Sequence, residues 1–133
     1  MQTLKIVFVI VIISICFISC EKEAGLGGKT TLILKPQHHS TPIPNQATHP
    51  DSAFIKFNAS DFPGDNAAAF DHIVVGNTGE DFVKVSGLKE GKYYIFMAGF
   101  DTSINQRVNG GIPYEITQEG GEITLIVFVT EVH

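Results

Sequence analysis

From Thr30 onward, apolar residues recur at every second position in short runs that are separated by turn residues. A period of two is typical of half-buried strands, and no stretch of ten residues has the period of an amphipathic helix. The runs that qualify as strands are residues 30–35, 53–58, 72–76, 81–86, 92–100, 113–118 and 122–131. The pattern therefore predicts an all-β domain of seven strands in two layers, a β-sandwich.

The breaks between these runs contain residues that favour turns. Segments 76–79, 89–92, 109–111 and 119–121 each contain glycine, which accepts the positive φ that many turns need. The last run, 122–131, is apolar on both faces, and this pattern predicts a central strand or one covered by a partner.

One of these turns leads into a segment with a family resemblance. Gly87, Leu88, Gly91 and Tyr93 resemble the Gly-Leu-x-x-Gly-x-Tyr segment of transthyretin-like and carboxypeptidase-regulatory-like β-sandwiches. The resemblance implies a Greek-key, immunoglobulin-like topology. It also implies a structural tyrosine corner of Leu88, Gly91 and Tyr93, in which the Tyr93 hydroxyl hydrogen-bonds back across the turn. Such a likeness bears on the fold more than on the function.

Residues 6–18 form an apolar run near the start of the chain, interrupted only by Ser14 and Cys16. A helix that crosses a membrane needs roughly 20 apolar residues, so this run is short for a transmembrane anchor. Its length is typical of the core of a signal peptide.

The run leads into Phe17-Ile18-Ser19-Cys20, which resembles the lipobox of bacterial lipoproteins. Ser19 and Cys20 match that motif, whereas Phe17 and Ile18 stand where leucine and a small residue are usual. The resemblance implies a lipid on Cys20 after cleavage of a signal peptide, residues 1–19. An ordinary secretory signal with an incidental cysteine is the alternative. The glycine-rich segment that follows predicts a flexible tether over residues 20–28, which leaves 29–133 for the β-sandwich domain.

Cysteine usage and charge exclude several classes of function. Cleavage would remove Cys16 and lipidation would occupy Cys20, so the mature chain would have no thiol for a disulfide, a nucleophile or a zinc site. The formal net charge is −5, and no run of lysine or arginine is present to bind phosphates. Nucleic-acid binding is therefore not expected.

Histidines give the strongest hint of a ligand site. His38, His39, His49 and Asp51 all fall in a proline-rich connection, residues 36–52. Imidazoles and a carboxylate are suitable ligands for Zn²⁺ or Cu²⁺, and the sequence indicates no other cofactor. Adjacent histidines on an extended backbone point to opposite sides, so His38 and His39 need a turn between them to bind one ion. A solvated polar loop without metal is the alternative explanation.

The sequence carries no known catalytic motif, such as a nucleophile elbow, a His-Glu-x-x-His zinc motif or a P-loop. We therefore expect a non-catalytic accessory or binding domain, which contacts a protein or a glycan through a sheet face or the 36–52 loop. Its expected place is the cell envelope, as an outer-membrane lipoprotein. Glu21-Lys22-Glu23 resembles the charged tag of surface-exposed lipoproteins. A metal-binding lipoprotein is the second hypothesis and a small hydrolase the third.

Overall fold

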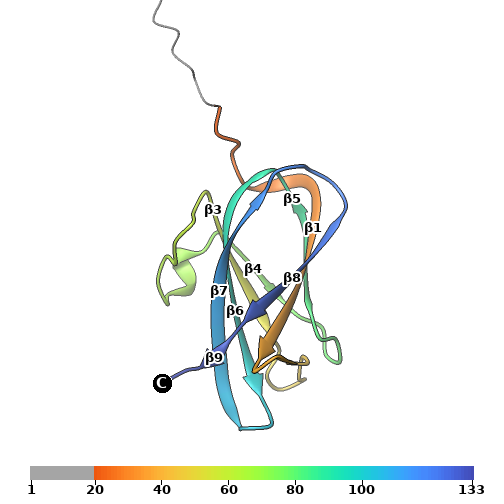
Figure 1. Cartoon of the computed structure of the whole chain (residues 1–133), viewed down its shortest axis with the longest axis vertical. Coiled ribbons are helices and arrows are strands. Elements are labelled where there is room, and N and C mark those ends of the chain that lie inside the picture. Colours follow the sequence, from red (N-terminus) through yellow and green to blue (C-terminus); the bar gives the residue numbers. More distant parts are fainter. Residues whose placement is uncertain (1–19) are drawn as a thin grey trace, which may run out of the picture.

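The computed structural model describes residues 20–133, in which two β-sheets form a sandwich-like, all-β domain (Figure 1). The prediction of an all-β chain is confirmed, and the one helical segment among these residues is a 3-10 turn, Ala67–Ala69. The described chain begins with Cys20 and enters the domain at its upper end in Figure 1, which we call the proximal end. The β6–β7 turn lies at the opposite, distal end.

The first sheet is built around a long central strand, β1 (Leu26–His38). Strand β5 (Val83–Leu88) pairs antiparallel to one edge of β1. Strand β8 (Glu122–Phe128) pairs parallel to its other edge. The two-residue strand β2 (Thr41–Pro42) folds back on the end of β1 as a hairpin.

The second sheet has five strands in the order β4-β3-β6-β7-β9, and all its pairs are antiparallel. Strands β3 (Ser52–Phe57) and β4 (His72–Val75) form one side of this sheet. Strands β6 (Gly91–Asp101) and β7 (Gln106–Ile116) form its long centre, and β9 (Thr130–Glu131) closes the edge of β7.

The core lies between the sheets and consists of the alternate residues that face inward. The largest fully buried side chains come from both sheets: Leu32, Leu34, Val83, Val85, Leu88 and Val127 from the first, and Ile55, Tyr93, Ile95, Met97, Val108 and Ile116 from the second. Burial of an apolar side chain of this size stabilises a fold by roughly 1.5–3 kcal/mol. The period of two in the sequence therefore arises from the residues that face this core.

The run 122–131 is not one strand in the structure. It breaks at Val129, whose N–H donates to the carbonyl oxygen of Gln37, and then crosses to the second sheet as β9. Gly110 of β7 makes the crossing feasible, because a Cβ there would overlap the carbonyl oxygen of Phe128. Among residues 20–133, β8 pairs only with β1, so the prediction of a central strand was wrong.

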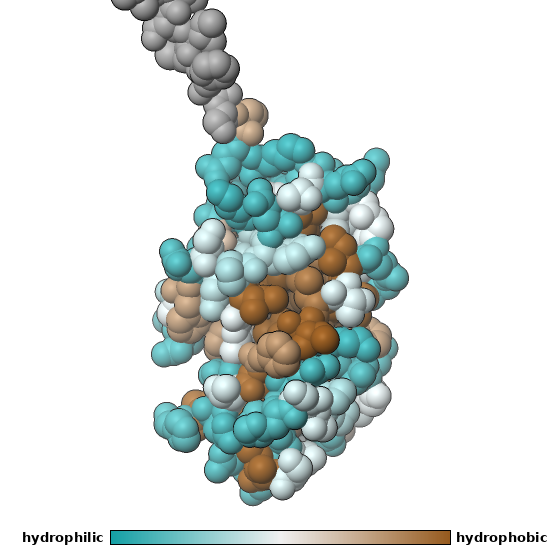
Figure 2. Space-filling view, in the orientation of Figure 1, coloured by the Kyte–Doolittle hydropathy of each residue, from teal (hydrophilic) through white to brown (hydrophobic). Residues whose placement is uncertain are grey.

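Apolar surface gathers over β8 as a result (Figure 2). Ile126 is 47% exposed and Phe128 is 63% exposed, and hydrophilic surface surrounds this area. The double-sided apolar pattern thus arises from one buried face and one face that is open to solvent.

The predicted turn at 109–111 is also wrong, because these residues lie inside β7. The two glycines there make close contacts instead of turning the chain. A Cβ on Gly111 would come within 2.8 Å of the Tyr94 ring, which lies over it from β6. β7 therefore begins at Gln106, seven residues before the predicted start of that strand.

The glycine-rich segment after Cys20 is held against the domain and does not form the predicted tether up to residue 28. Ala24 is buried, and its N–H donates to the side-chain oxygen of Asn58 at 2.8 Å. Gly25 donates to the Tyr93 hydroxyl at 3.0 Å, and β1 starts at Leu26. Glycine content alone misled the prediction, because these small residues permit close packing as well as flexibility.

Candidate functional site

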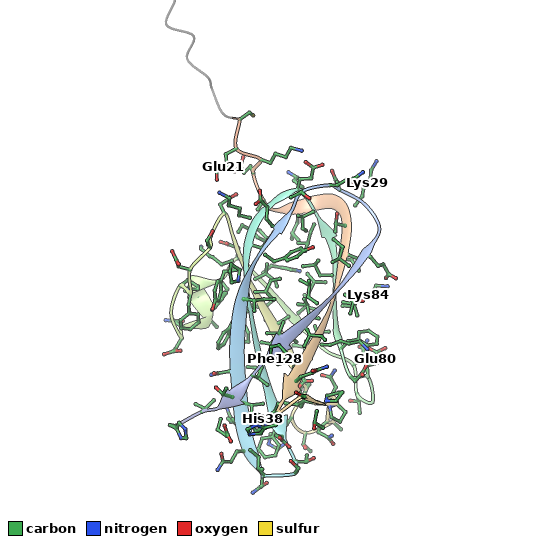
Figure 3. The ribbon with its side chains drawn as sticks, viewed as in Figure 1. Glu21, Lys29, His38, Glu80, Lys84 and Phe128 are labelled. Carbon is green, nitrogen blue, oxygen red and sulfur yellow. The ribbon has the colours of Figure 1, made fainter. Side chains whose placement is uncertain are left out.

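His38 and His39 lie at the distal end, where β1 turns into β2 (Figure 3). His39 and Ser40 form the two-residue turn, with φ angles of +48° and +64°. Positive φ at both positions is the signature of a type I′ hairpin turn. The turn rotates the His39 ring back towards His38, and the ring centroids are 4.1 Å apart. His38 and His39 need such a turn if they are to bind the same ion.

His38 is the last inward-facing residue of β1 and is only 3% exposed. Its Nδ1 lies 2.7 Å from a carboxylate oxygen of Asp101, the last residue of β6. Asp101 in turn accepts hydrogen bonds from the backbone N–H and the hydroxyl of Ser103, at 2.8 and 2.6 Å. The bond to Asp101 raises the pKa of His38, and the bonds from Ser103 and His38 lower the pKa of Asp101.

Glu131 of β9 completes this group of side chains. One of its carboxylate oxygens lies 3.3 Å from Nε2 of His38, and the other lies 3.7 Å from Nε2 of His39. The Glu131 oxygen is out of line for a hydrogen bond to His38, whose Nε2 is buried without a hydrogen-bond partner among residues 20–133. Each of the three residues offers one possible ligand atom within 4.8 Å of the other two. We call His38, His39 and Glu131 the distal triad.

The other two predicted metal ligands lie elsewhere. Asp51 is fully buried just before β3, and neither of its carboxylate oxygens has a hydrogen-bond partner in the described part of the chain. It occupies space left by Gly99, since a Cβ at that position would overlap its carboxylate. Burial raises the pKa of Asp51 from about 3.8 to about 7.

His49 belongs to a groove on the outer face of the second sheet. Its ring stacks on Phe100 with centroids 4.2 Å apart. The groove has a volume of about 440 Å³ and is lined by loop residues, by the strand residues beneath them and by Val132 near the end of the chain. Its floor contains Phe54 and Ala98, and Arg107 and Asn109 of β7 add polar groups along one side. This combination suits a ligand that has both apolar and hydrogen-bonding surface.

The remaining aromatic side chains have structural roles. Phe62 and Phe70, from the connection between β3 and β4, pack over the outer face of the second sheet. Their contacts form a second small core with Phe54, Tyr94 and Phe96, in which the ring centroids lie 5.0–6.4 Å apart. Tyr114 packs against the main core.

The tyrosine corner closes the proximal end of the sandwich. The Tyr93 hydroxyl donates to the carbonyl oxygen of Lys89 at 2.7 Å and accepts from the Gly25 N–H. Leu88 is fully buried beside the turn, and Gly91 has a φ of +144°. A Cβ on Gly91 would lie 2.6 Å from the Ala24 nitrogen, so this glycine also makes room for the incoming chain. The Tyr93 bond to Lys89 is the contact that the family resemblance implies.

The sequence analysis identified two of the three triad residues and missed Glu131 and also Asp101, which contacts His38. Both acids lie far from His38 along the chain, and only the pairing of strand ends brings them together. The sequence gives a signal for Asp101, which continues the inward-facing alternation of Tyr93, Ile95 and Met97. An acid at the end of an apolar alternation is a candidate partner for a polar residue on the facing sheet.

No helix in residues 20–133 is long and apolar enough to cross a membrane. The Cys20 thiol is exposed where the described chain begins. A scan against protein-family models found no match, and searches of curated proteins and of solved structures found no significant similarity.

Proposed function

We propose that this protein is a non-catalytic binding domain of the bacterial cell envelope, held at the outer membrane by a lipid on Cys20. Its binding site is the groove beside His49 and Phe100, and its ligand is a saccharide of a neighbouring glycan. The observation that carries the proposal is the position of this groove. Phe100 and Arg107 adjoin the turn at the distal end, whereas Cys20 lies at the proximal end (Figure 1).

The groove chemistry supports a saccharide. Sugar rings present apolar C–H faces and hydroxyl edges, which match an aromatic floor beside polar side chains. Phe54 and Phe100 supply the aromatic surface, and Thr48, Arg107 and Asn109 supply hydrogen-bonding groups. A protein loop is the second occupant to be tested, because the same groove would also accept a short extended segment.

For the fold we propose the Greek-key, transthyretin-like type that the Gly87–Tyr93 segment implies, with β1 and β3 to β8 as its seven main strands. Two features support it: β1 pairs antiparallel to β5 and parallel to β8, and Tyr93 hydrogen-bonds back to Lys89. Neither feature specifies a ligand, so the function rests on the groove.

Binding is tested by NMR titration of the purified protein with a panel of cell-envelope oligosaccharides and with unrelated short peptides. We expect a saccharide to shift the resonances of groove residues, and Phe100→Ala to weaken binding roughly tenfold. Phe128→Ala, on the other sheet, is the matched control and should bind like the wild type. Shifts caused only by peptides would favour a protein partner, and shifts elsewhere on the domain would refute the groove.

The anchor is tested separately by expressing the full chain in a bacterial host with a clickable palmitate analogue. The wild type should carry the label and sediment with the membrane fraction. Cys20→Ala should lose the label and leave that fraction. An unlabelled wild-type protein would refute the lipid anchor without affecting the groove.

A further inference from the structure

We infer that the distal triad is a binding site for a divalent transition metal such as Zn²⁺. Its ligands are His38, His39 and Glu131, each of which offers one ligand atom within 4.8 Å of the other two. Nε2 of His38 and Nε2 of His39 lie 3.3 and 3.7 Å from the Glu131 carboxylate oxygens. Ligand atoms around one Zn²⁺ lie about 2 Å from the ion, so small side-chain rotations bring this group to ligating distances. The site does not depend on the proposed function of the groove.

The state of His38 is the first argument for a metal. This residue is only 3% exposed, and within residues 20–133 its Nε2 has no hydrogen-bond partner. Buried polar atoms in native proteins are nearly always paired, so an unpaired one indicates a missing partner. The atom lies 3.3 Å from the Glu131 carboxylate and beside the His39 ring, where a cation would satisfy all three groups.

The surroundings of His38 are the second argument. A histidine that binds a metal usually donates its other ring N–H to a carboxylate, which fixes the tautomer and orients the ring. Asp101 makes this contact with Nδ1 at 2.7 Å, and Ser103 holds Asp101 through two hydrogen bonds. With Nδ1 donating its proton to Asp101, the neutral ring would present the Nε2 lone pair to an ion. Asp101 is a positioning residue in this arrangement.

The ligand types indicate which class of ion the site binds. Two imidazoles and one carboxylate form a three-residue set that is common at zinc sites with a fourth, open position. Mg²⁺ and Ca²⁺ prefer sets of oxygen ligands, so they should bind this site poorly. Cu²⁺ also accepts imidazole and carboxylate ligands, and its relative affinity is measured in the same experiment.

The backbone also holds the ligand residues in place. His39 and Ser40 hold positive φ angles in the hairpin turn, and Glu131 is placed by the pairing of β9 with β7. The ligands therefore come from two sheets, and an ion would join the end of β1 to the last strand of the chain.

The test is isothermal titration calorimetry of the purified protein with ZnCl₂, with CuCl₂, CaCl₂ and MgCl₂ as comparisons. All variants carry Cys16→Ser and Cys20→Ser, so that no thiol binds the ion. We expect one Zn²⁺ per chain, at least tenfold weaker binding in Glu131→Gln and in His39→Asn, and no response to Ca²⁺ or Mg²⁺. Asparagine at position 39 tolerates the positive φ, so this variant keeps the turn. His72→Gln, on β4, is the matched control and should bind like the parent.

The role of Asp101 is read by NMR from the ¹⁵N shifts of the His38 ring. Asp101→Asn should weaken Zn²⁺ binding about 10- to 100-fold and change the tautomer signal of His38 in the metal-free protein. Absence of Zn²⁺ binding to the parent protein would overturn the inference. So would an equal loss of affinity in His72→Gln and in the triad variants.

Discussion

The two ends of the sandwich interior are both closed by polar side chains, but only one end is saturated with hydrogen bonds. At the proximal end, the Tyr93 hydroxyl pairs with Lys89 and Gly25, and Asn58 pairs with Ala24. At the distal end, the buried polar atoms without partners among residues 20–133 are Nε2 of His38 and both carboxylate oxygens of Asp51.

This difference separates a structural role from a binding role. A buried network whose members are all paired stabilises one conformation and leaves nothing for a ligand to satisfy. Unpaired buried groups cost free energy in the folded state, and a ligand that pairs with them recovers it. The distal end is therefore the part of the interior where binding and stability should be linked.

The largest effect is expected at Asp51. Its folded pKa of about 7 exceeds its ordinary value near 3.8, so the folded state binds the proton more tightly than the unfolded state. The contribution of Asp51 to the free energy of unfolding should therefore be highest below about pH 4. It should fall as the pH rises to 7. The loss is about 4 kcal/mol above pH 7.

The measurement is urea unfolding from pH 4 to pH 8. Asp51→Asn keeps the size of the side chain and removes the titration, so this part of the pH slope should disappear. An equal slope in wild type and variant would show that Asp51 is not the titrating group.

Zinc should have the second largest effect. Free Zn²⁺ at about 100 times its dissociation constant should raise the free energy of unfolding by about 2.7 kcal/mol, because only the folded state assembles the distal triad. Thermal unfolding with and without Zn²⁺ measures this gain, which the at least tenfold weaker binding of His39→Asn should reduce to about 1.4 kcal/mol or less. Equal stabilisation of both proteins would mean that the ion binds elsewhere.

The proximal end is tested by Tyr93→Phe, which removes only the hydroxyl. The carbonyl oxygen of Lys89 and the N–H of Gly25 lose their bonds to it, and we expect a loss of about 2 kcal/mol in the free energy of unfolding. Tyr94→Phe, on the outer face of the same strand, is the control and should cost less than about 0.5 kcal/mol. Similar losses in the two variants would contradict the structural role of the Tyr93 network.

The smallest effect is expected at Phe128, which lies on the solvent face of β8 and is 63% exposed. Its main-chain partner is Gln37, the neighbour of His38, so it lies near the distal end without facing the interior. Phe128→Ser should change stability by less than about 0.5 kcal/mol, measured by urea unfolding, and should leave Zn²⁺ binding unchanged. A large loss would show that an outward-facing side chain also supports the distal end.

The alternation of apolar residues predicted where the strands lie, because a half-buried strand repeats its environment every two residues. It could not predict how the strands end. The break at Val129 and the close contacts of Gly110 and Gly111 depend on chain segments that meet only in the folded state. The predicted ligand set was inaccurate for the same reason. Its four residues are close in the sequence, within the 36–52 connection, but the structure separates His49 and Asp51 from His38.

The parallel pairing of β1 with β8 has a mechanical consequence. With the chain attached to a membrane through Cys20 and a ligand held at the distal end, tension would act along the axis of β1. Seven residue pairs, from Thr31 with Glu122 to Gln37 with Phe128, join β1 to β8 across that axis. Their hydrogen bonds would be sheared together and would not open one after another. Single-molecule pulling from residue 20 should therefore meet high resistance in this ladder.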